Sequence, residues 1–141
     1  MSYGNYNTVE ASAYLTGGLS DTLAADIAGY ISNQGQGYGR NLFTGDDIQK
    51  TQDLAARSKW LFTPSDIDTL TLAFDFERTH SSTLDAFRLV YGHPSNWGPG
   101  APEPTGQPYL FTGGPWDTAT YQNPVDDFMQ GGASAIYVHD F

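Results

Sequence analysis

Strict alternation of apolar and polar residues in two stretches constrains this chain more than any other feature. In Val9–Ser32 the apolar residues fall at odd positions, and in Leu54–His80 they fall at even positions. Each stretch is interrupted once by turn-forming residues, Thr16–Thr22 in the first and Thr63–Thr69 in the second. A period of two over about ten residues is typical of a β-strand with one apolar and one polar face. The sequence therefore predicts two antiparallel β-hairpins, each with two unlike faces.

Composition excludes several classes of protein. The formal net charge is −10 over 141 residues, which argues against a nucleic-acid partner because such proteins carry a basic surface. Cysteine is absent, so disulfides and thiolate metal sites are excluded. No apolar run approaches the roughly 18 residues of a transmembrane helix. The first residues, Met1–Asn5, lack the basic and apolar regions of a signal peptide, so we expect either a cytosolic chain or a piece of a longer one.

The connections between the expected strands alternate between short and long. We expect a hairpin over residues 6–32, a long loop over 33–53, a hairpin over 54–80, a long Pro/Gly-rich loop over 81–130 and a last strand over 132–141. Proline is disfavoured inside central strands, and seven of the eight prolines fall in the segment 81–130. Short turns at one end and long loops at the other are typical of outer-membrane barrels. The fold class predicted is all-β, an antiparallel up-and-down meander that forms part of a transmembrane barrel with long extracellular loops.

The two faces of these strands have different expected surroundings. The apolar face would contact lipid, and the polar face would line the lumen. The expected lumen-facing polar residues are Glu10, Asp26, Arg57, Lys59, Asp75 and Glu77. The two basic residues lie on one strand of the second hairpin and two of the acidic residues on its partner strand, where opposite charges can attract across the pair. Alternation alone also fits a soluble antiparallel sheet with one solvated face, so this alternative stays open.

A series of segments in this order resembles the start of the barrel in TonB-dependent outer-membrane receptors, immediately after the plug domain. The segments are Gly4–Leu15, Gly17–Ala25, Gln34–Asn41, Leu54–Pro64 and Thr69–Glu77. The resemblance covers about residues 4–79 and is weaker in the tail. It implies a fragment of a receptor for active uptake of a nutrient such as a siderophore, a cobalamin or a saccharide. It also implies a place in the outer membrane of a Gram-negative cell, in contact with lipid, as part of a longer barrel.

The chain also departs from that family. The receptors have a plug, through which they contact the TonB complex, and neither feature is found in this sequence. Their barrels have about 22 strands, whereas four clear strands and a possible fifth are expected here. An open sheet edge is not tolerated in lipid. We therefore expect that this chain alone is not a transporter, and a non-functional gene remnant remains a further alternative.

Aromatic residues of the long loop are the candidate ligand contacts. The residues expected to contact a small-molecule ligand are Trp97, Tyr109 and Trp116, which lie among glycines and prolines. The alternative for these rings is packing within the loop. If the chain is instead a soluble all-β carbohydrate-binding or interaction module, the same rings would bind the sugar. In that case a second layer must cover the apolar face, which a barrel fragment leaves bare.

Nothing in the sequence favours catalysis, a cofactor or a metal. The pairs Asp46-Asp47 and Asp126-Asp127 lack an EF-hand pattern and are expected to be solvated charges. The three histidines lack the spacing of a helical metal site. The glycine-rich run Gly35–Gly39 lacks the lysine and following helix of a phosphate loop, so we expect a flexible loop. The sequence has no nucleophile elbow, and an enzyme is not expected.

Overall fold

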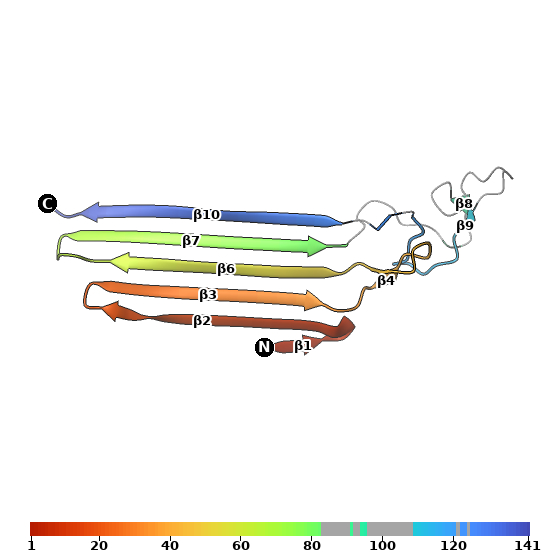
Figure 1. The fold of residues 1–141 in the computed structure, drawn as a ribbon, viewed down its shortest axis with the longest axis horizontal. Helices are drawn as coiled ribbons and strands as arrows, with labels where there is room; N and C mark the ends of the chain where they lie inside the picture. Colours follow the sequence, from red (N-terminus) through yellow and green to blue (C-terminus); the bar gives the residue numbers. More distant parts are fainter. Residues whose placement is uncertain (83–90, 92–93, 96–108, 121, 124) are drawn as a thin grey trace.

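The chain folds into one open antiparallel sheet with a small folded region at one end (Figure 1). The computed structural model describes residues 1–82, 91, 94–95, 109–120, 122–123 and 125–141. The sheet contains β1 (Ser2–Gly4), β2 (Thr8–Ser20), β3 (Leu23–Gln34), β6 (Thr51–Phe62), β7 (Asp68–Ser81) and β10 (Asp126–His139), in this spatial order. Each strand pairs antiparallel with the next, so the all-β antiparallel meander expected from the sequence is confirmed.

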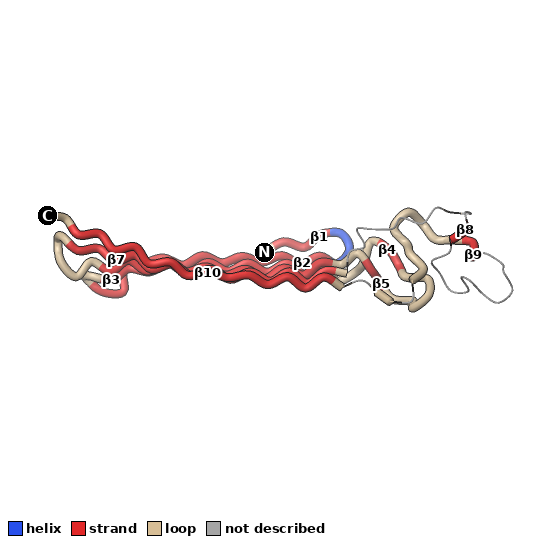
Figure 2. The backbone as a smooth tube through the Cα atoms, turned by 90° about the horizontal axis from the view of Figure 1, so that it is seen from above, coloured by secondary structure: helices blue, strands red, loops and turns tan. Residues whose placement is uncertain are grey.

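Seen along its edge, the sheet is a single thin layer (Figure 2). Alternating side chains of the five long strands therefore point to two opposite open faces. The sheet does not close on itself: β1 covers β2 only between Thr8 and Glu10, and the far side of β10 pairs with no described strand. In the described structure the sheet is therefore open and not a closed barrel.

The short elements gather at the end of the sheet where the long connections lie (Figure 1). They are the 3-10 turn η1 (Asn5–Asn7), the pair β4 (Gly39–Arg40) with β5 (Asp47–Ile48), and the pair β8 (Pro94–Ser95) with β9 (Tyr109–Leu110). No helix in the described part of the chain is long and apolar enough to cross a membrane. We refer to the described residues beyond the long strands at this end as the loop end.

The first hairpin turn is shorter than the sequence predicted. The expected turn, Thr16–Thr22, was wrong at its start, because β2 continues to Ser20 and only Asp21 and Thr22 separate it from β3. The glycines at 17 and 18 stay paired with β3, and an irregularity between Gly18 and Ser20 absorbs the extra residue. The second turn was predicted well, since β6 ends at Phe62 and β7 begins at Asp68.

The last strand begins earlier than predicted. We expected it over 132–141, but it spans Asp126–His139. Gly131 and Gly132 lie inside the strand, opposite Phe76 and Asp75 of β7. A Cβ at Gly131 would lie 3.0 Å from the carbonyl oxygen of Asp75. Gly131 therefore allows a close approach of two backbones, and a Cβ at Gly132 would lie 3.1 Å from the Asp75 carboxylate, so neither glycine marks a turn.

Buried side chains lie at the loop end and not on the sheet faces. Among the described residues, the buried apolar side chains are those of Ile48, Phe111 and Ala119. Three polar residues are also buried: Asn41 and Thr118 at the loop end, and Gln34, which is the last residue of β3. The sheet itself has no second layer in the described part of the structure. Its stability as an isolated chain therefore rests on strand pairing, and both faces remain available for contacts.

Candidate functional site

Strand register aligns the apolar residues of both hairpins on one face of the sheet. Each cross-strand row continues from strand to strand because directly paired residues share a face. The rows are Leu23-Phe62-Leu70-Tyr137, Ala25-Trp60-Leu72-Ala135, Leu15-Ile27-Ser58-Phe74-Ala133, Ala13-Gly29-Ala56-Phe76-Gly131 and Ala11-Ile31-Leu54-Arg78-Met129, and the last row contains their one charged residue, Arg78. We call these five rows the apolar band. Rows two residues apart give the band a length of about 27 Å along the strands. Most of its large side chains, including Ile27 and Phe74, are exposed, and Leu23, Leu70 and Leu72 are half-buried.

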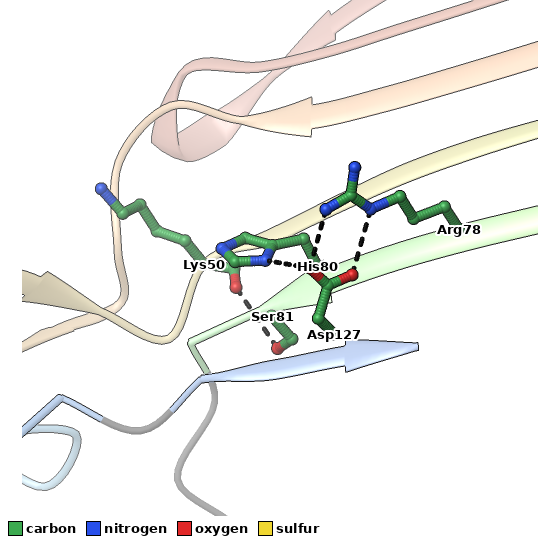
Figure 3. Close-up of polar contacts among 5 residues, drawn as sticks. All are labelled: Lys50, Arg78, His80, Ser81 and Asp127. Carbon is green, nitrogen blue, oxygen red and sulfur yellow. Dashed lines mark hydrogen bonds and ion pairs between the residues drawn. The ribbon is translucent and has the colours of Figure 1, made fainter. Parts of the chain in front are cut away.

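Polar groups mark both ends of the apolar band. Toward the loop end, the Arg78 guanidinium donates two hydrogen bonds to Asp127, at 3.0 and 2.7 Å, and His80 Nδ1 lies 3.5 Å from the same carboxylate (Figure 3). The ammonium of Lys50 points away from this cluster (Figure 3), while the Lys50 carbonyl accepts a hydrogen bond from Ser81 Oγ at 3.3 Å.

At the opposite end of the band, the Tyr137 hydroxyl donates a hydrogen bond to Asp68. His139 Nδ1 lies 2.8 Å from the same Asp68 oxygen. The ring of His139 in turn meets the ring of Phe141 edge to face, with centroids 4.9 Å apart. The apolar surface thus has a defined extent, with amphipathic aromatic residues and charges at its limits.

The opposite face carries all six residues predicted to face the lumen. Glu10 lies on β2, Asp26 on β3, Arg57 and Lys59 on β6, and Asp75 and Glu77 on β7. Register pairs Arg57 with Asp75, and Lys59 with Asp26. The charges are therefore neighbours, as their spacing predicted, although Lys59 faces β3 and not Glu77. No ion pair within 4.0 Å joins them in the described structure.

Hydrogen bonds on this polar face run between neighbouring strands. Glu10 accepts from Ser2 Oγ at 3.0 Å and from the Tyr30 hydroxyl at 3.4 Å, and Gln130 donates to Glu77. A hollow of about 590 Å³ crosses the middle of the face. Its lining includes Ser12, Tyr14, Tyr30, Arg57, Asp75, Glu77 and Gln130. This face can therefore contact water or polar solutes over its whole width.

The predicted ligand-contact residues have different outcomes. Trp97 lies outside the described residues, and for Tyr109 the structure describes only the backbone, within β9. Trp116 is exposed at the loop end, with its ring centroid 6.4 Å from that of Tyr38. Tyr38 in turn contacts Tyr6 edge to face, with centroids 4.4 Å apart. We call Tyr6, Tyr38 and Trp116 the aromatic row.

Sequence reasoning did not select Tyr6 or Tyr38, because they lie far from the Pro/Gly-rich segment. One signal could have found Tyr38: it stands between two glycines, Gly37 and Gly39. Both glycines are buried, and a Cβ on either would meet backbone atoms at about 2 Å. The run Gly35–Gly39, expected to be a flexible loop, is therefore packed tightly against other segments.

A buried asparagine connects the two halves of the loop end. Asn41 Nδ2 donates to the Thr120 carbonyl at 3.0 Å and to Asn123 Oδ1 at 2.8 Å. Asn41 Oδ1 accepts from the backbone N–H groups of Phe43 and Thr120, at 3.1 and 3.2 Å. Residues about 80 positions apart in the chain are thus joined by one fully buried side chain. Such satisfied buried polar groups specify a single local arrangement.

The acidic pairs take part in hydrogen bonds within the protein. Asp46 accepts from Asn123 Nδ2 at 2.6 Å. This bond is the main reason that the pKa of the Asp46 carboxyl is lowered from 3.8, and a bond with Thr44 is the second. In the other pair, Asp127 binds Arg78 as described above. No group of three potential metal ligands is found in the part of the chain that the structure describes.

Comparison with family models, curated proteins and solved structures gives no match to this chain. The resemblance to TonB-dependent receptors therefore stays a prediction from the sequence. What the chain does must be argued from the two faces of the sheet and from the loop end.

Proposed function

We propose that this chain forms part of the wall of an outer-membrane β-barrel, in a receptor of the TonB-dependent kind that takes up a nutrient. The observation that carries the proposal is the apolar band, which extends over the five long strands on one face of a single-layer sheet and contains one charged residue, Arg78 in its last row. In this arrangement the band contacts the hydrocarbon of a Gram-negative outer membrane. The polar face lines the interior.

The dimensions of the strands support this proposal. The five long strands have 12 to 14 residues, and about 9–11 tilted residues suffice to cross a bilayer. A band of about 27 Å along strands tilted by 35–45° covers about 20 Å of depth, comparable to the apolar belt of such barrels. Charged groups begin at the last row of the band with Arg78, and Asp127 lies in the next row, near the level of the lipid headgroups.

The connections also support it. The hairpin turns after Ser20 and Phe62 lie together at one end of the sheet, and the long connections lie at the other (Figure 1). In outer-membrane barrels the short turns are periplasmic and the long loops are extracellular. The aromatic row would then face the outside of the cell, where a ligand arrives.

The open edges indicate that this sheet needs further strands, because unpaired backbone groups are costly in lipid. We therefore propose that the chain acts within a longer barrel. Contact with the TonB complex would be made by the plug of an intact receptor, and this chain would supply wall strands and external loops.

A soluble all-β carbohydrate-binding or interaction module is the second candidate. It is favoured by the exposed rings at the loop end, which such modules also use. It requires another layer over the apolar band, since an exposed apolar surface of this extent is far larger than monomeric soluble proteins leave uncovered.

Cysteine scanning of β7 separates the two candidates. The chain has no cysteine, so each introduced thiol is unique. Single variants Leu72→Cys, Phe74→Cys and Phe76→Cys test the apolar band, and Thr71→Cys, Ala73→Cys and Asp75→Cys are matched controls on the other face. The full chain is folded into phosphatidylcholine vesicles at a protein density that lets copies pair through their open edges, which are costly in lipid when unpaired. It is then treated with a charged maleimide that does not enter hydrocarbon.

We expect the three control thiols to react and the three band thiols to be protected, with a period of two along the strand. Protection that is present in vesicles and absent in the same variants kept in aqueous buffer without lipid would support contact with lipid. Equal labelling of both faces, or a monomer that stays in the aqueous fraction with its band protected, would contradict the proposal and favour the soluble module.

A further inference from the structure

Three aromatic rings from distant parts of the chain meet at the loop end. The ring planes of Tyr6 and Tyr38 make an angle of 76°, and those of Tyr38 and Trp116 make an angle of 47°. Their residues are 43%, 51% and 62% exposed, respectively. These rings therefore present a large aromatic surface outside the apolar band, where contact with lipid hydrocarbon does not account for it.

The backbone beneath the rings is fixed by close approaches. A Cβ at Gly39 would lie 1.9 Å from the Trp116 carbonyl oxygen, and a Cβ at Gly37 would lie 2.0 Å from that of Ile48. The segments that carry Tyr38 and Trp116 thus touch through their main chains. Glycine is the residue that permits this contact.

Further main-chain hydrogen bonds complete this framework. The N–H of Gln36 donates to the Tyr6 carbonyl at 2.9 Å, and the N–H of Thr118 donates to the Arg40 carbonyl at 3.0 Å. All three rings consequently stand on one connected backbone. A surface that is already ordered loses little conformational entropy when a ligand binds.

Tyr6 has a strained backbone. Its φ of 59° and ψ of 31° are left-handed values that non-glycine residues seldom adopt, and Asn7 follows with φ of 54°. Strain of this kind persists where the surrounding structure holds it and is concentrated at ligand-binding positions. Here the strain places the Tyr6 ring against the edge of Tyr38.

The chemistry of the row suits a sugar ring. The C–H groups on one side of a pyranose pack on an aromatic face, while its hydroxyls need polar partners. The hydroxyls of Tyr6 and Tyr38 have no hydrogen-bond partner in the described structure, so they can donate to the hydroxyls of a sugar. Because the three rings are inclined to one another, they fit a compact, puckered ring better than a wide planar ligand.

The charge of the surface around the aromatic row favours a neutral ligand over an anionic one. The chain has a net charge of −10, and Asp46, Asp47 and Asp117 lie on the segments around the row. The side chain of Arg40, a nearby cation, donates through Nε to the Gly45 carbonyl at 2.9 Å. An anionic ligand would therefore meet a mainly negative surface, whereas a neutral one would not be repelled.

We propose that Tyr6, Tyr38 and Trp116 form a binding site for a pyranose unit of a neutral saccharide. The site itself needs no membrane, but the conclusion that the saccharide is the nutrient taken up rests on the proposed function.

The test is a titration of the full chain, in detergent, with three neutral trisaccharides: α-1,4-linked glucose, β-1,4-linked glucose and β-1,4-linked xylose. Binding is followed by tryptophan fluorescence and by saturation-transfer NMR of the sugar protons. We expect at least one trisaccharide to bind, and Trp116→Ala and Tyr38→Ala each to weaken its affinity about tenfold. Trp60→Phe, in the apolar band, is the matched control and should leave the affinity unchanged.

Two further variants are controls for misfolding. Trp116→Phe and Tyr38→Phe keep a ring and should lose less affinity than the alanine variants, with unchanged far-UV circular dichroism. The proposal is overturned if no trisaccharide binds at millimolar concentration, or if the alanine variants bind as well as the unaltered chain. Sugar binding without lipid protection of the β7 cysteines would reject the barrel proposal and support this binding site. Lipid protection without sugar binding would support the barrel proposal and reject this binding site.

Discussion

The guanidinium of Arg78 and the carboxylate of Asp127 share two hydrogen bonds, at 3.0 and 2.7 Å, that join β7 to β10 at the limit of the apolar band. In the register of these strands Asp127 lies opposite His80, two residues beyond Arg78, so the pair is diagonal. A shift of one residue would separate the two charges and also turn every side chain of β10 to the other face. The pair therefore favours the register that builds the band.

Arg78→Gln should loosen the start of β10. We expect faster hydrogen exchange at the backbone amides of Phe128 and Met129, with little change in β2 and β3. The charge-reversed double variant Arg78→Glu, Asp127→Arg should restore most of the protection, because it rebuilds the same pair. Exchange that is unchanged in Arg78→Gln would show that pairing of the backbones alone sets the register.

Phe74→Arg should strongly destabilise the chain in a bilayer. Phe74 lies in the middle row of the band, and a cation at the midplane on the lipid face costs about 2–4 kcal/mol. Ala73→Arg adds the same charge one residue away on the polar face and should cost much less. Urea unfolding from phospholipid vesicles measures both; equal losses would argue against lipid on the Phe74 side.

Asn41→Ala should unfold the loop end and leave the long strands paired. The substitution leaves half-buried groups without their partner, including the N–H of Thr120 and the carboxamide of Asn123, at a cost of about 1–3 kcal/mol. Hydrogen exchange at Leu42 and Thr118 should accelerate, while amides of β6 stay protected. Asn33→Ala, at an exposed position of β3, is the control and should change neither.

Gly39→Ala should destabilise the folded chain, whereas Gly29→Ala should not. At Gly39 a methyl group collides with the Trp116 carbonyl, so the segments must separate, at a cost of about 1–3 kcal/mol. At Gly29 no atom lies within 4 Å of the new methyl group, and the substitution should be neutral or slightly stabilising. Thermal unfolding followed by fluorescence checks both. A tolerated Gly39→Ala would contradict the close packing under Tyr38.

The loop end should become less stable in acid because of Asp46. Folding lowers the pKa of this carboxyl below 3.8, mainly through the hydrogen bond from Asn123. A lowered pKa means that the ionised form is favoured in the folded chain, so its contribution is complete above pH 3.8 and is lost as the pH falls through the folded value. Asp46→Asn should flatten this dependence, as measured by NMR at Asn41 and Asn123 across the range. An unaltered profile in the variant would assign the effect to another group.

Much of the fold was predictable because the decisive signal is local. Alternation over Leu54–Phe62 and Leu70–Phe76 identifies strands without any knowledge of their partners, and it gave the correct common face for the band. The residues of the polar face were predicted from the same alternation. Glycine was harder to interpret, because a glycine can mark a turn or a close approach of two backbones, and Gly131 belongs to the second case.

The sequence by itself determined the strands, their two unlike faces and the alternation of short and long connections. Only the tertiary structure decided where the strands end, because Ser20 and Asp126 are strand residues through pairing with another strand and not through their own preferences. It also decided the loop end, where Tyr6, Tyr38 and Trp116 meet and Asn41 binds Thr120. Such contacts join residues up to about 80 positions apart. A periodic pattern records the environment of each residue but not the identity of a distant neighbour, so these sites emerge only when the chain is folded.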